Sequence, residues 1–361
     1  MCRLAVMLGV VVLTVFSVPA RADNPSADGQ LTPEQIRQGW LSLFDGETTF
    51  GWHVEGEARI DKGKLVLGGK KPTRAHPTTG FGPCSYRLSV HCKGSGSVTI
   101  NDTISLRNAS RVLSDKLNRS HAAPVASLVV EANTEVVVDY LHVRPEQTVP
   151  LFNGKDLTGW KVFKDNPKQS RSIFSVTKEG WLNVKDGPGD LQTEQLFDDF
   201  VLQLECRSNG KHLNSGIFFR CQPGKYQQGY EVQIRNQFTE SASQKYTVEE
   251  YDPSTHKLLS KKVVLSPAVD FGTGAIYRRM PARKGVARDG EWFTLTLVAR
   301  GRHLATWVDD VQVVDWTDNR PASDNARQGF RAAAGAISIQ GHDPTTDLSF
   351  RNFRIVPLRK K

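Results

Sequence analysis

The sequence predicts an all-β protein made of two antiparallel β-sandwiches, the first reduced in size, with one short helix ahead of them. Three observations support this fold class. Apolar residues alternate with polar ones, or form runs of five to eight residues, as strands do. Turn residues rather than helical periods separate these runs, which favours an antiparallel sandwich over a parallel α/β sheet. A motif also recurs along the chain, whose 361 residues suffice for two domains.

The first 22 residues have the pattern of a secretory signal peptide. Arg3 precedes an apolar run over 4–18, and Ala20-Arg21-Ala22 has the small-x-small form of a cleavage site. The run is shorter than the ~20 residues that cross a membrane as a helix. We therefore expect an exported protein, periplasmic or extracellular, without a membrane span.

A short helix is expected directly before the first strands. Thr32 suits the N-cap position, Pro33 the first helical position and Glu34 the acidic first turn. These residues predict a helix that runs to about Gln38.

The remaining elements are predicted to be strands. Turn residues such as Asn209-Gly210, Pro223-Gly224 and Asp289-Gly290 separate them. The clearest strands are expected at 64–67, 200–207, 216–221, 230–235, 293–299, 305–308 and 336–340.

The chain contains a degenerate duplication. Leu43-Phe44-Asp45-Gly46, followed by Gly51-Trp52, recurs 108 positions later as Leu151-Phe152-Asn153-Gly154, followed by Gly159-Trp160. A proline-bounded polar connector over 144–150 separates the two copies. We predict a reduced sandwich over 40–147, an ancillary binding or packing domain, and a second domain over 148–361 with its own core.

Composition excludes several classes of protein. The net charge is +9, but the basic residues are dispersed and no nucleic-acid-binding motif accompanies them, so no nucleic-acid partner is expected. No cysteine pair has metal-site spacing, and no acidic cluster has the ligand spacing of a calcium site. The possibility of a structural calcium ion stays open, but no metal and no cofactor is predicted.

Cys206 and Cys221 could meet across a hairpin and form a disulfide; the alternative is that both are buried free thiols. The oligomeric state is not predicted.

Several strands of the second copy carry polar residues on one side. In 230–235, Tyr230, Val232 and Ile234 face one way, while Glu231 and Gln233 face the other, because side chains alternate along a strand. Carboxylates, amides, guanidinium and imidazole groups on one face suit the recognition of sugar hydroxyls. The alternative is the ordinary polar outer face of a half-exposed sheet. The residues expected on this face are Glu205, Asn214, Arg220, Glu231, Gln233, Gln340 and His342.

The second copy of the motif and the segments that follow it resemble the 3-keto-disaccharide hydrolase family. The opening motif Leu-Phe-Asn-Gly-Lys-Asp-Leu-Thr-Gly-Trp stands at 151–160. Further segments follow in the family's order at 214–220, 229–234, 273–277, 290–292, 340–342 and 350–353. The resemblance implies a concanavalin A-like jelly roll whose concave face holds a saccharide. It also implies cleavage of glycosides oxidised to a ketone at C3, by hydrolysis or by elimination followed by hydration. The first copy lacks the central segments.

The chemistry that the resemblance implies assigns roles to these residues. A C3 ketone acidifies the C2 hydrogen, so a base can remove it and the C1 substituent can leave by β-elimination. Glu231 or His342 could be the base or the acid, and Arg220 could stabilise the enolate and keep Glu231 ionised. Tyr277 is a second candidate proton donor. The residues expected to bind the substrate are Asn214, Gln233, Gln340, Tyr277 and Glu205.

The main alternative is a non-catalytic, lectin-like carbohydrate-binding module, since a fold does not fix an activity. Other enzymes fit less well. The Glu-x-Asp-x-x-Glu pattern of retaining glucanases is incomplete at 250–255, and no Gly-x-Ser-x-Gly elbow of a serine hydrolase is present.

Overall fold

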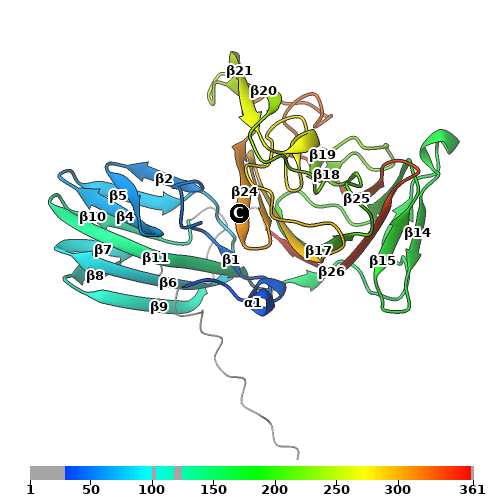
Figure 1. Ribbon diagram of the computed structural model, residues 1–361. Helices are drawn as coiled ribbons and strands as arrows, with labels where there is room; N and C mark the ends of the chain where they lie inside the picture. Colours follow the sequence, from blue (N-terminus) through cyan, green and yellow to red (C-terminus); the bar gives the residue numbers. More distant parts are fainter. Residues whose placement is uncertain (1–28, 100–102, 118–123, 359–361) are drawn as a thin grey trace, which may run out of the picture.

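The computed structural model describes residues 29–99, 103–117 and 124–358 and is almost entirely β (Figure 1). Four of its sheets stack in pairs as two sandwiches, so the predicted fold class is confirmed. The predicted signal peptide lies outside the described residues and stays a prediction. Within those residues, no helix has the length and apolar character needed to cross a membrane.

The predicted helix is present as α1 (Pro33–Arg37). The Gln35 backbone N–H donates to Thr32 Oγ1 at 3.2 Å, and the Thr32 N–H donates to Gln35 Oε1 at 2.8 Å. This reciprocal pair satisfies two amide groups that the helix start leaves unpaired, and it confirms Thr32 as the N-cap.

The first sandwich is built from strands of residues 41–145. One sheet has the order β3 (Ala58–Asp61), β4 (Lys64–Gly69), β11 (Thr134–Pro145), β6 (Cys84–Lys93), β9 (Ser110–Leu117), with β1 (Leu41–Ser42) beside β11. The other has the order β2 (Trp52–Glu55), β5 (Thr73–Pro77), β10 (Ser127–Val130), β7 (Ser95–Thr99), β8 (Thr103–Arg107).

The second sandwich pairs an eight-stranded with a five-stranded sheet. The eight-stranded sheet has the order β14 (Ile173–Val176), β15 (Leu182–Lys185), β26 (Asp347–Pro357), β17 (Phe200–Ser208), β22 (Phe293–Arg300), β23 (His303–Val308), β24 (Val311–Thr317), with β12 (Val149–Pro150) beside β26. The five-stranded sheet has the order β13 (Trp160–Val162), β16 (Gly189–Thr193), β25 (Ala336–Gly341), β18 (Ser215–Cys221), β19 (Tyr230–Ile234). A separate hairpin joins β20 (Gln244–Tyr251) and β21 (Leu258–Ser266). All seven predicted strands are present, with ends within two residues of expectation.

The recurring motif forms the same local structure in both sandwiches. Trp52 Nε1 donates to the Leu43 carbonyl at 2.6 Å, and Trp160 Nε1 donates to the Leu151 carbonyl at 3.0 Å. In each copy, the tryptophan is the first residue of a strand, and its indole hydrogen bond connects that strand to the first residue of the motif. The shared hydrogen bond explains why leucine and tryptophan keep their spacing.

The two sandwiches meet through an apolar interface. The core cluster of the first sandwich continues into the outer face of the eight-stranded sheet through Val201, Val298, Trp307 and Val356. Trp307 is fully buried, and its Nε1 donates to the Ser42 carbonyl at 3.0 Å. Apolar residues of the second sandwich thus pack against the first core, while each sandwich keeps its own sheets. That the second sandwich folds alone stays a prediction.

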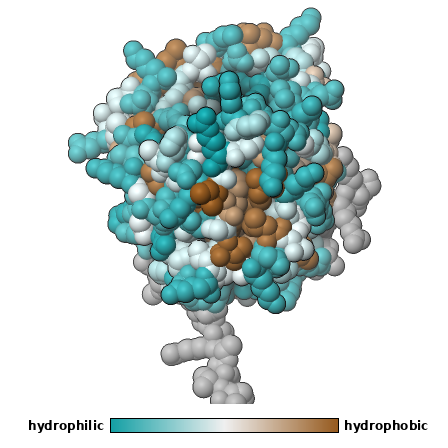
Figure 2. Space-filling model, turned by 90° about the vertical axis from the view of Figure 1, so that its right-hand side faces the viewer, coloured by the Kyte–Doolittle hydropathy of each residue, from teal (hydrophilic) through white to brown (hydrophobic). Residues whose placement is uncertain are grey.

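The face of the second sandwich that points away from the first is mainly hydrophilic. Figure 2 shows this face, with hydrophobic side chains gathered near its middle. Exposed apolar residues in the described chain include Ile173 of β14, with 56% of its surface accessible. Small apolar groups of this kind are ordinary on a protein surface and do not by themselves mark a binding site.

Cys206 and Cys221 are both buried as free thiols. Cys206 lies in β17 and Cys221 in β18, which belong to opposite sheets of the second sandwich. The expected hairpin between them does not form, so the alternative of free thiols holds for this pair.

Candidate active site

The five-stranded sheet carries a row of polar residues on the face away from its core. In β19, Tyr230, Val232 and Ile234 belong to the core, so Glu231 and Gln233 point to the opposite side. The register continues this polar face across the sheet, because Glu231 lies opposite Phe218 and Phe218 opposite Ser338, while Gln340 lies opposite Asp190. Strand periodicity therefore brings Glu231, Gln233 and Gln340 to one face, as the sequence predicts.

This polar face is buried, and part of its hydrogen-bonding capacity is unused. Asn214 Oδ1, Ser338 Oγ and Gln340 Oε1 are buried without a partner among the described residues. Buried polar atoms are ordinarily paired, so unpaired oxygens on neighbouring strands indicate a place where water or a polar ligand supplies the missing bonds.

Glu231 is buried on this face, next to the guanidinium of Arg327. Its side chain is 8% exposed, and its Oε2 lies 3.6 Å from Arg327 Nη2. A Cβ atom at residue 216 would lie only 2.7 Å from Glu231 Oε1, so Gly216 leaves the space that the carboxyl group fills. The Arg327 guanidinium also lies over the ring of Phe218, 5.4 Å from its centre.

Glu231 is a proton donor at neutral pH rather than a base. Burial raises its pKa to about 8, and the negative charges of Asp270 and Asp190 add to this, while Arg327 opposes it. The sequence-based expectation of an ionised Glu231 is therefore wrong, because desolvation outweighs the attraction of the neighbouring guanidinium. A carboxylic acid with this pKa can protonate a leaving group.

The raised pKa of Glu231 predicts a pH-dependent stability. Between about pH 4.5 and pH 8 the folded protein holds this proton and the unfolded chain does not, so stability falls as pH rises across that window. In Glu231→Gln this dependence should disappear. The variant should gain ~3–5 kcal/mol relative to wild type between pH 4 and pH 9, measured by urea unfolding at both pH values. An equal difference in unfolding free energy at both would contradict the shift.

A cavity of about 230 Å³ opens beside Glu231. It is lined by Gly229, Tyr230, Glu231, Ile276, Tyr277, Arg278, Arg279, Ala326 and Arg327. Tyr277 lies in it as expected, and its backbone N–H donates to the Glu231 carbonyl at 2.9 Å. Burial raises the pKa of the Tyr277 phenol, so this group also carries its proton. Three arginines beside two proton donors suit a ligand that develops negative charge.

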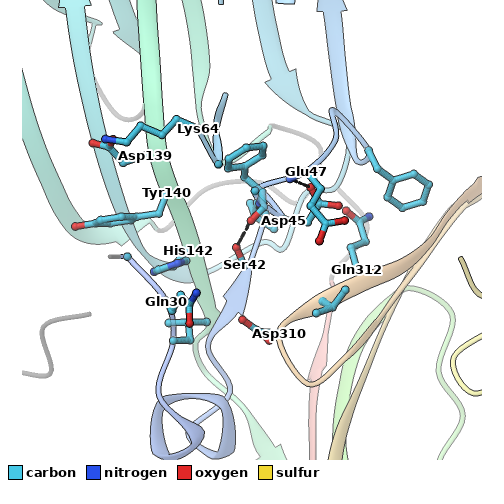
Figure 3. A pocket seen from close by; sticks show the side chains of 18 of the residues that line it. Gln30, Ser42, Asp45, Glu47, Lys64, Asp139, Tyr140, His142, Asp310 and Gln312 are labelled. Atoms are coloured by element: carbon cyan, nitrogen blue, oxygen red, sulfur yellow. Dashed lines mark hydrogen bonds and ion pairs between the residues drawn. The ribbon is translucent and has the colours of Figure 1, made fainter. Parts of the chain in front are cut away.

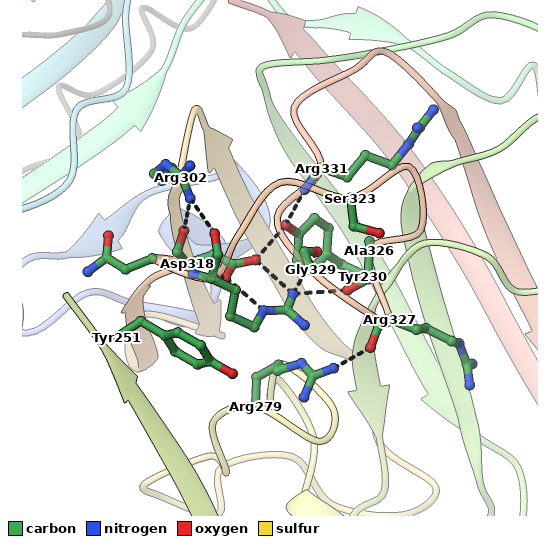
Figure 4. A network of polar contacts seen from close by, with 12 residues as sticks. Tyr230, Tyr251, Arg279, Arg302, Asp318, Ser323, Ala326, Arg327, Gly329 and Arg331 are labelled. Carbon is green, nitrogen blue, oxygen red and sulfur yellow. Dashed lines mark hydrogen bonds and ion pairs between the residues drawn. The ribbon is translucent and has the colours of Figure 1, made fainter. Parts of the chain in front are cut away.

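A buried network holds the loop that carries Arg327 (Figure 4). Tyr230 Oη donates to Asp318 Oδ2 at 2.7 Å, and Arg320 Nη2 contacts the same oxygen at 2.7 Å. Arg320 Nη2 also donates to the Ala326 carbonyl at 2.9 Å. Because Tyr230 precedes Glu231 in β19, the network fixes Arg327 relative to the carboxyl group that it faces.

Asp270 joins the polar face from a loop, and nothing in the strand pattern pointed to it. Its Oδ2 accepts hydrogen bonds from Asn214 Nδ2 at 2.9 Å and from Gln233 Nε2 at 3.1 Å. Its φ of 49° is uncommon for a non-glycine residue, and such strain is frequent at functional sites. Asn214 and Gln233 thus hold a second carboxylate with their amide groups.

Arg220 does not belong to this site, which corrects the role predicted for it. The register of β18 and β25 shifts between Phe218 and Cys221, and the side chain of Arg220 turns away from the polar face at this irregularity. Its guanidinium is fully buried and donates to the carbonyls of Asp198, Gly301 and Arg331 and to Asp199 Oδ1, at 2.7–3.0 Å. Arg220 is a structural residue, and Arg327 is the guanidinium beside Glu231.

Arg220→Leu should therefore lower the free energy of unfolding rather than the rate of the chemical step. Removing one partner of a buried ion pair leaves Asp199 without its counter-charge and three carbonyls without the guanidinium donor, at a cost of ~3–5 kcal/mol in unfolding free energy. Chemical denaturation measures this loss. If the variant kept its stability but had a lower turnover rate, the result would instead support a catalytic role for Arg220.

Two further predicted residues lie elsewhere. Glu205 is in β17 of the opposite sheet, where its Oε2 binds Arg351 Nη2 at 2.6 Å, so the core separates it from the polar face. His342 follows β25, pairs with Asp343 at 2.7 Å and is 41% exposed. Two strand spacings and four residues separate it from Glu231, which corresponds to ~16 Å between Cα atoms. His342 is also not among the residues that line the cavity beside Glu231.

No metal centre accompanies these groups: within the described part of the chain, no three or more His, Cys, Asp or Glu side chains are grouped so that they could hold an ion.

A comparison with protein families assigns the second sandwich to a known family. Residues 147–356, more than half of the chain, match the model of the family described as the 3-keto-alpha-glucoside-1,2-lyase-like domain. No curated protein matches the chain.

Several solved structures are similar to part of the chain. A provisionally assigned glycosyl hydrolase from Parabacteroides distasonis has 19% identity and a TM-score of 0.42, covering 59% of this chain and 94% of its own. Another from the same organism has 23% identity and a TM-score of 0.41, covering 59% and 100%. The carbohydrate-binding module CBM66 from Bacillus subtilis has 14% identity and a TM-score of 0.33, covering 56% and 97%. These similarities are too distant to transfer a function.

Proposed function

Since the chain belongs to the 3-keto-alpha-glucoside-1,2-lyase-like family, and is carbohydrate-active on that ground, we propose that its second sandwich cleaves glycosides whose C3 hydroxyl has been oxidised to a ketone. The observation that carries the proposal is the buried Glu231, with Arg327 at 3.6 Å and a cavity beside both; burial raises the pKa of Glu231 to about 8.

The reaction is a β-elimination made accessible by the ketone. A base takes the C2 proton, and the C–H electron pair forms a C2=C3 bond while negative charge collects on the C3 oxygen. The C3 carbonyl then reforms, the electrons move to make C1=C2, and the C1–O bond breaks. The departing oxygen receives a proton, and water later adds across C1=C2. The step needs an acid, a base and a cation near the ketone.

The groups near Glu231 meet these three needs. Glu231 is the acid for the departing oxygen, because its pKa of about 8 keeps it protonated at neutral pH. Arg327 stabilises charge on the C3 oxygen; its side chain is 37% exposed and can meet a ligand. Asp270 is the base; it is held by the amide groups of Asn214 and Gln233, and Gln233 lies two residues after Glu231 in β19.

The remaining polar atoms bind the sugar. Ser338 Oγ and Gln340 Oε1, which have no partner in the described part of the chain, can accept hydrogen bonds from its hydroxyl groups. Tyr277 is a second hydroxyl contact at the cavity.

Incubation with 3-keto-trehalose, 3-keto-lactose and their unoxidised parents, followed by NMR, tests the proposal. We expect cleavage of the keto compounds and none of the parents, because only the ketone acidifies the C2 hydrogen. Binding of all four compounds without turnover would contradict it and would favour a non-catalytic saccharide-binding module.

A further inference from the structure

A second and larger cavity, of about 770 Å³, lies where the first sandwich meets the second (Figure 3). The first sandwich lines it with β1, the turn that follows β1, and part of β11; the second lines it with Arg283, Lys284 and the turn between β23 and β24. None of its lining residues lines the Glu231 cavity. Its volume is within the range of small-molecule sites, ~300–1,000 Å³.

The residues that line this interdomain cavity carry equal numbers of negative and positive side chains. Its four carboxylates and four Lys or Arg side chains are largely paired with one another. Asp139 contacts Lys64 at 2.6 Å, and Arg283 contacts Asp45 at 2.8 Å. Lys284 contacts Glu47 at 2.6 Å. A charged ligand would have to displace these pairs, so the lining favours a neutral one.

Two buried polar atoms at the cavity have no partner among the described residues. One is His142 Nδ1, on a side chain that is 1% exposed in the first sandwich; the other is Gln312 Nε2, on a side chain that is 6% exposed in the second. Burial lowers the pKa of His142 to about 4, so its imidazole is neutral. A hydroxyl group can donate to the imidazole nitrogen, and another hydroxyl group can accept from the amide nitrogen. A ligand with several hydroxyl groups can therefore satisfy both atoms, whereas a carboxylate can only accept and an ammonium ion can only donate.

An aromatic surface lies next to these atoms. The Tyr140 ring is stacked on the His142 ring, with 4.8 Å between centres and 13° between planes, and both residues line the cavity. Figure 3 shows Asp310 of the second sandwich at the same opening. Aromatic rings with a few amide and carboxylate groups are what a pyranose ring and its hydroxyls need.

We propose that this interdomain cavity is a second saccharide-binding site, specific for a neutral oligosaccharide and separate from the site of Glu231. The first sandwich then contributes ligand contacts through β11, although it lacks the central segments of the second copy. The proposal does not depend on which residues carry out cleavage.

Isothermal titration of the full-length protein with maltohexaose, which carries no ketone, tests the site. We expect binding in the range of ~1 mM or tighter. His142→Phe and Gln312→Leu should each weaken binding at least ~10-fold, a loss of about 1.4 kcal/mol. Gln312→Leu should not lower the melting temperature, because the amide nitrogen that it removes is buried without a partner among the described residues. His142→Phe keeps a ring beside Tyr140 but loses a hydrogen bond to the Gly29 backbone, so its melting temperature is measured as the control for folding. Cleavage of 3-keto-lactose should be unchanged in both variants.

Three outcomes would overturn the proposal. One is unchanged maltohexaose affinity in both variants. Another is tighter binding of glucose 6-phosphate than of maltohexaose, which would identify an anion site. The third is the absence of binding of both maltohexaose and lactose at millimolar concentration. All three are binding results, so they are distinct from a failure to cleave 3-keto substrates.

Discussion

Glu231→Gln is expected to lower the rate of 3-keto-lactose cleavage by ~10²–10⁴-fold, the usual cost of losing a positioned acid. The amide keeps the shape of the side chain but cannot protonate the departing oxygen. Removal of the C2 proton does not need this group, so exchange of the C2 hydrogen with D₂O, followed by NMR, should continue in the variant.

The pH dependence of the wild-type enzyme supplies a second readout of Glu231. Since its pKa is about 8, kcat/KM should fall as pH rises through that value, because the acid loses its proton. The matched control is Glu250→Gln, whose exposed carboxylate pairs with Lys262 on the hairpin. The control should keep both rate and pH profile. Normal turnover in Glu231→Gln would eliminate Glu231 as a catalytic residue.

Asp270→Asn should have a different signature, with cleavage and C2 exchange both lost by ~10²–10⁴-fold. An amide at residue 270 cannot accept the C2 proton, and it also leaves Asn214 and Gln233 without the carboxylate oxygen they share. Asp343→Asn, beside the exposed His342, is the matched control and should exchange and cleave normally.

The two variants together assign acid and base. If Glu231→Gln stops exchange while Asp270→Asn preserves it, the two roles are reversed. If both preserve exchange and cleavage, neither carboxyl group takes part and the proposed mechanism fails. Circular dichroism checks that each variant is folded.

Local elements of this protein follow from residue order alone. Thr32, Pro33 and Gln35 act on their immediate neighbours, so the helix could be predicted. The strands follow from short-range alternation, and the same alternation places Glu231 and Gln233 on one face. The repeated Leu and Trp positions are likewise explained by a hydrogen bond within nine residues.

Arg220 shows where strand periodicity fails. Alternation placed it on the face of Phe218, but the register shift after Phe218 turned its side chain to a set of buried carbonyls. A single irregularity of this kind exchanges the two sides of a strand, and the apolar pattern gives no sign of it. His342 was misjudged for a related reason, because the chain leaves β25 before reaching it.

The sequence by itself therefore determined the all-β class, the capped helix, the duplicated motif and the polar face with Glu231. Only the tertiary structure decided what surrounds that face. Arg327 and Asp270 reach it from loops distant in sequence, held by side chains such as Arg320 and Gln233. The pKa of Glu231 and the cavity between the sandwiches were decided in the same way. Burial depends on every element packed around a group, whereas strand alternation and helix capping depend only on near neighbours along the chain.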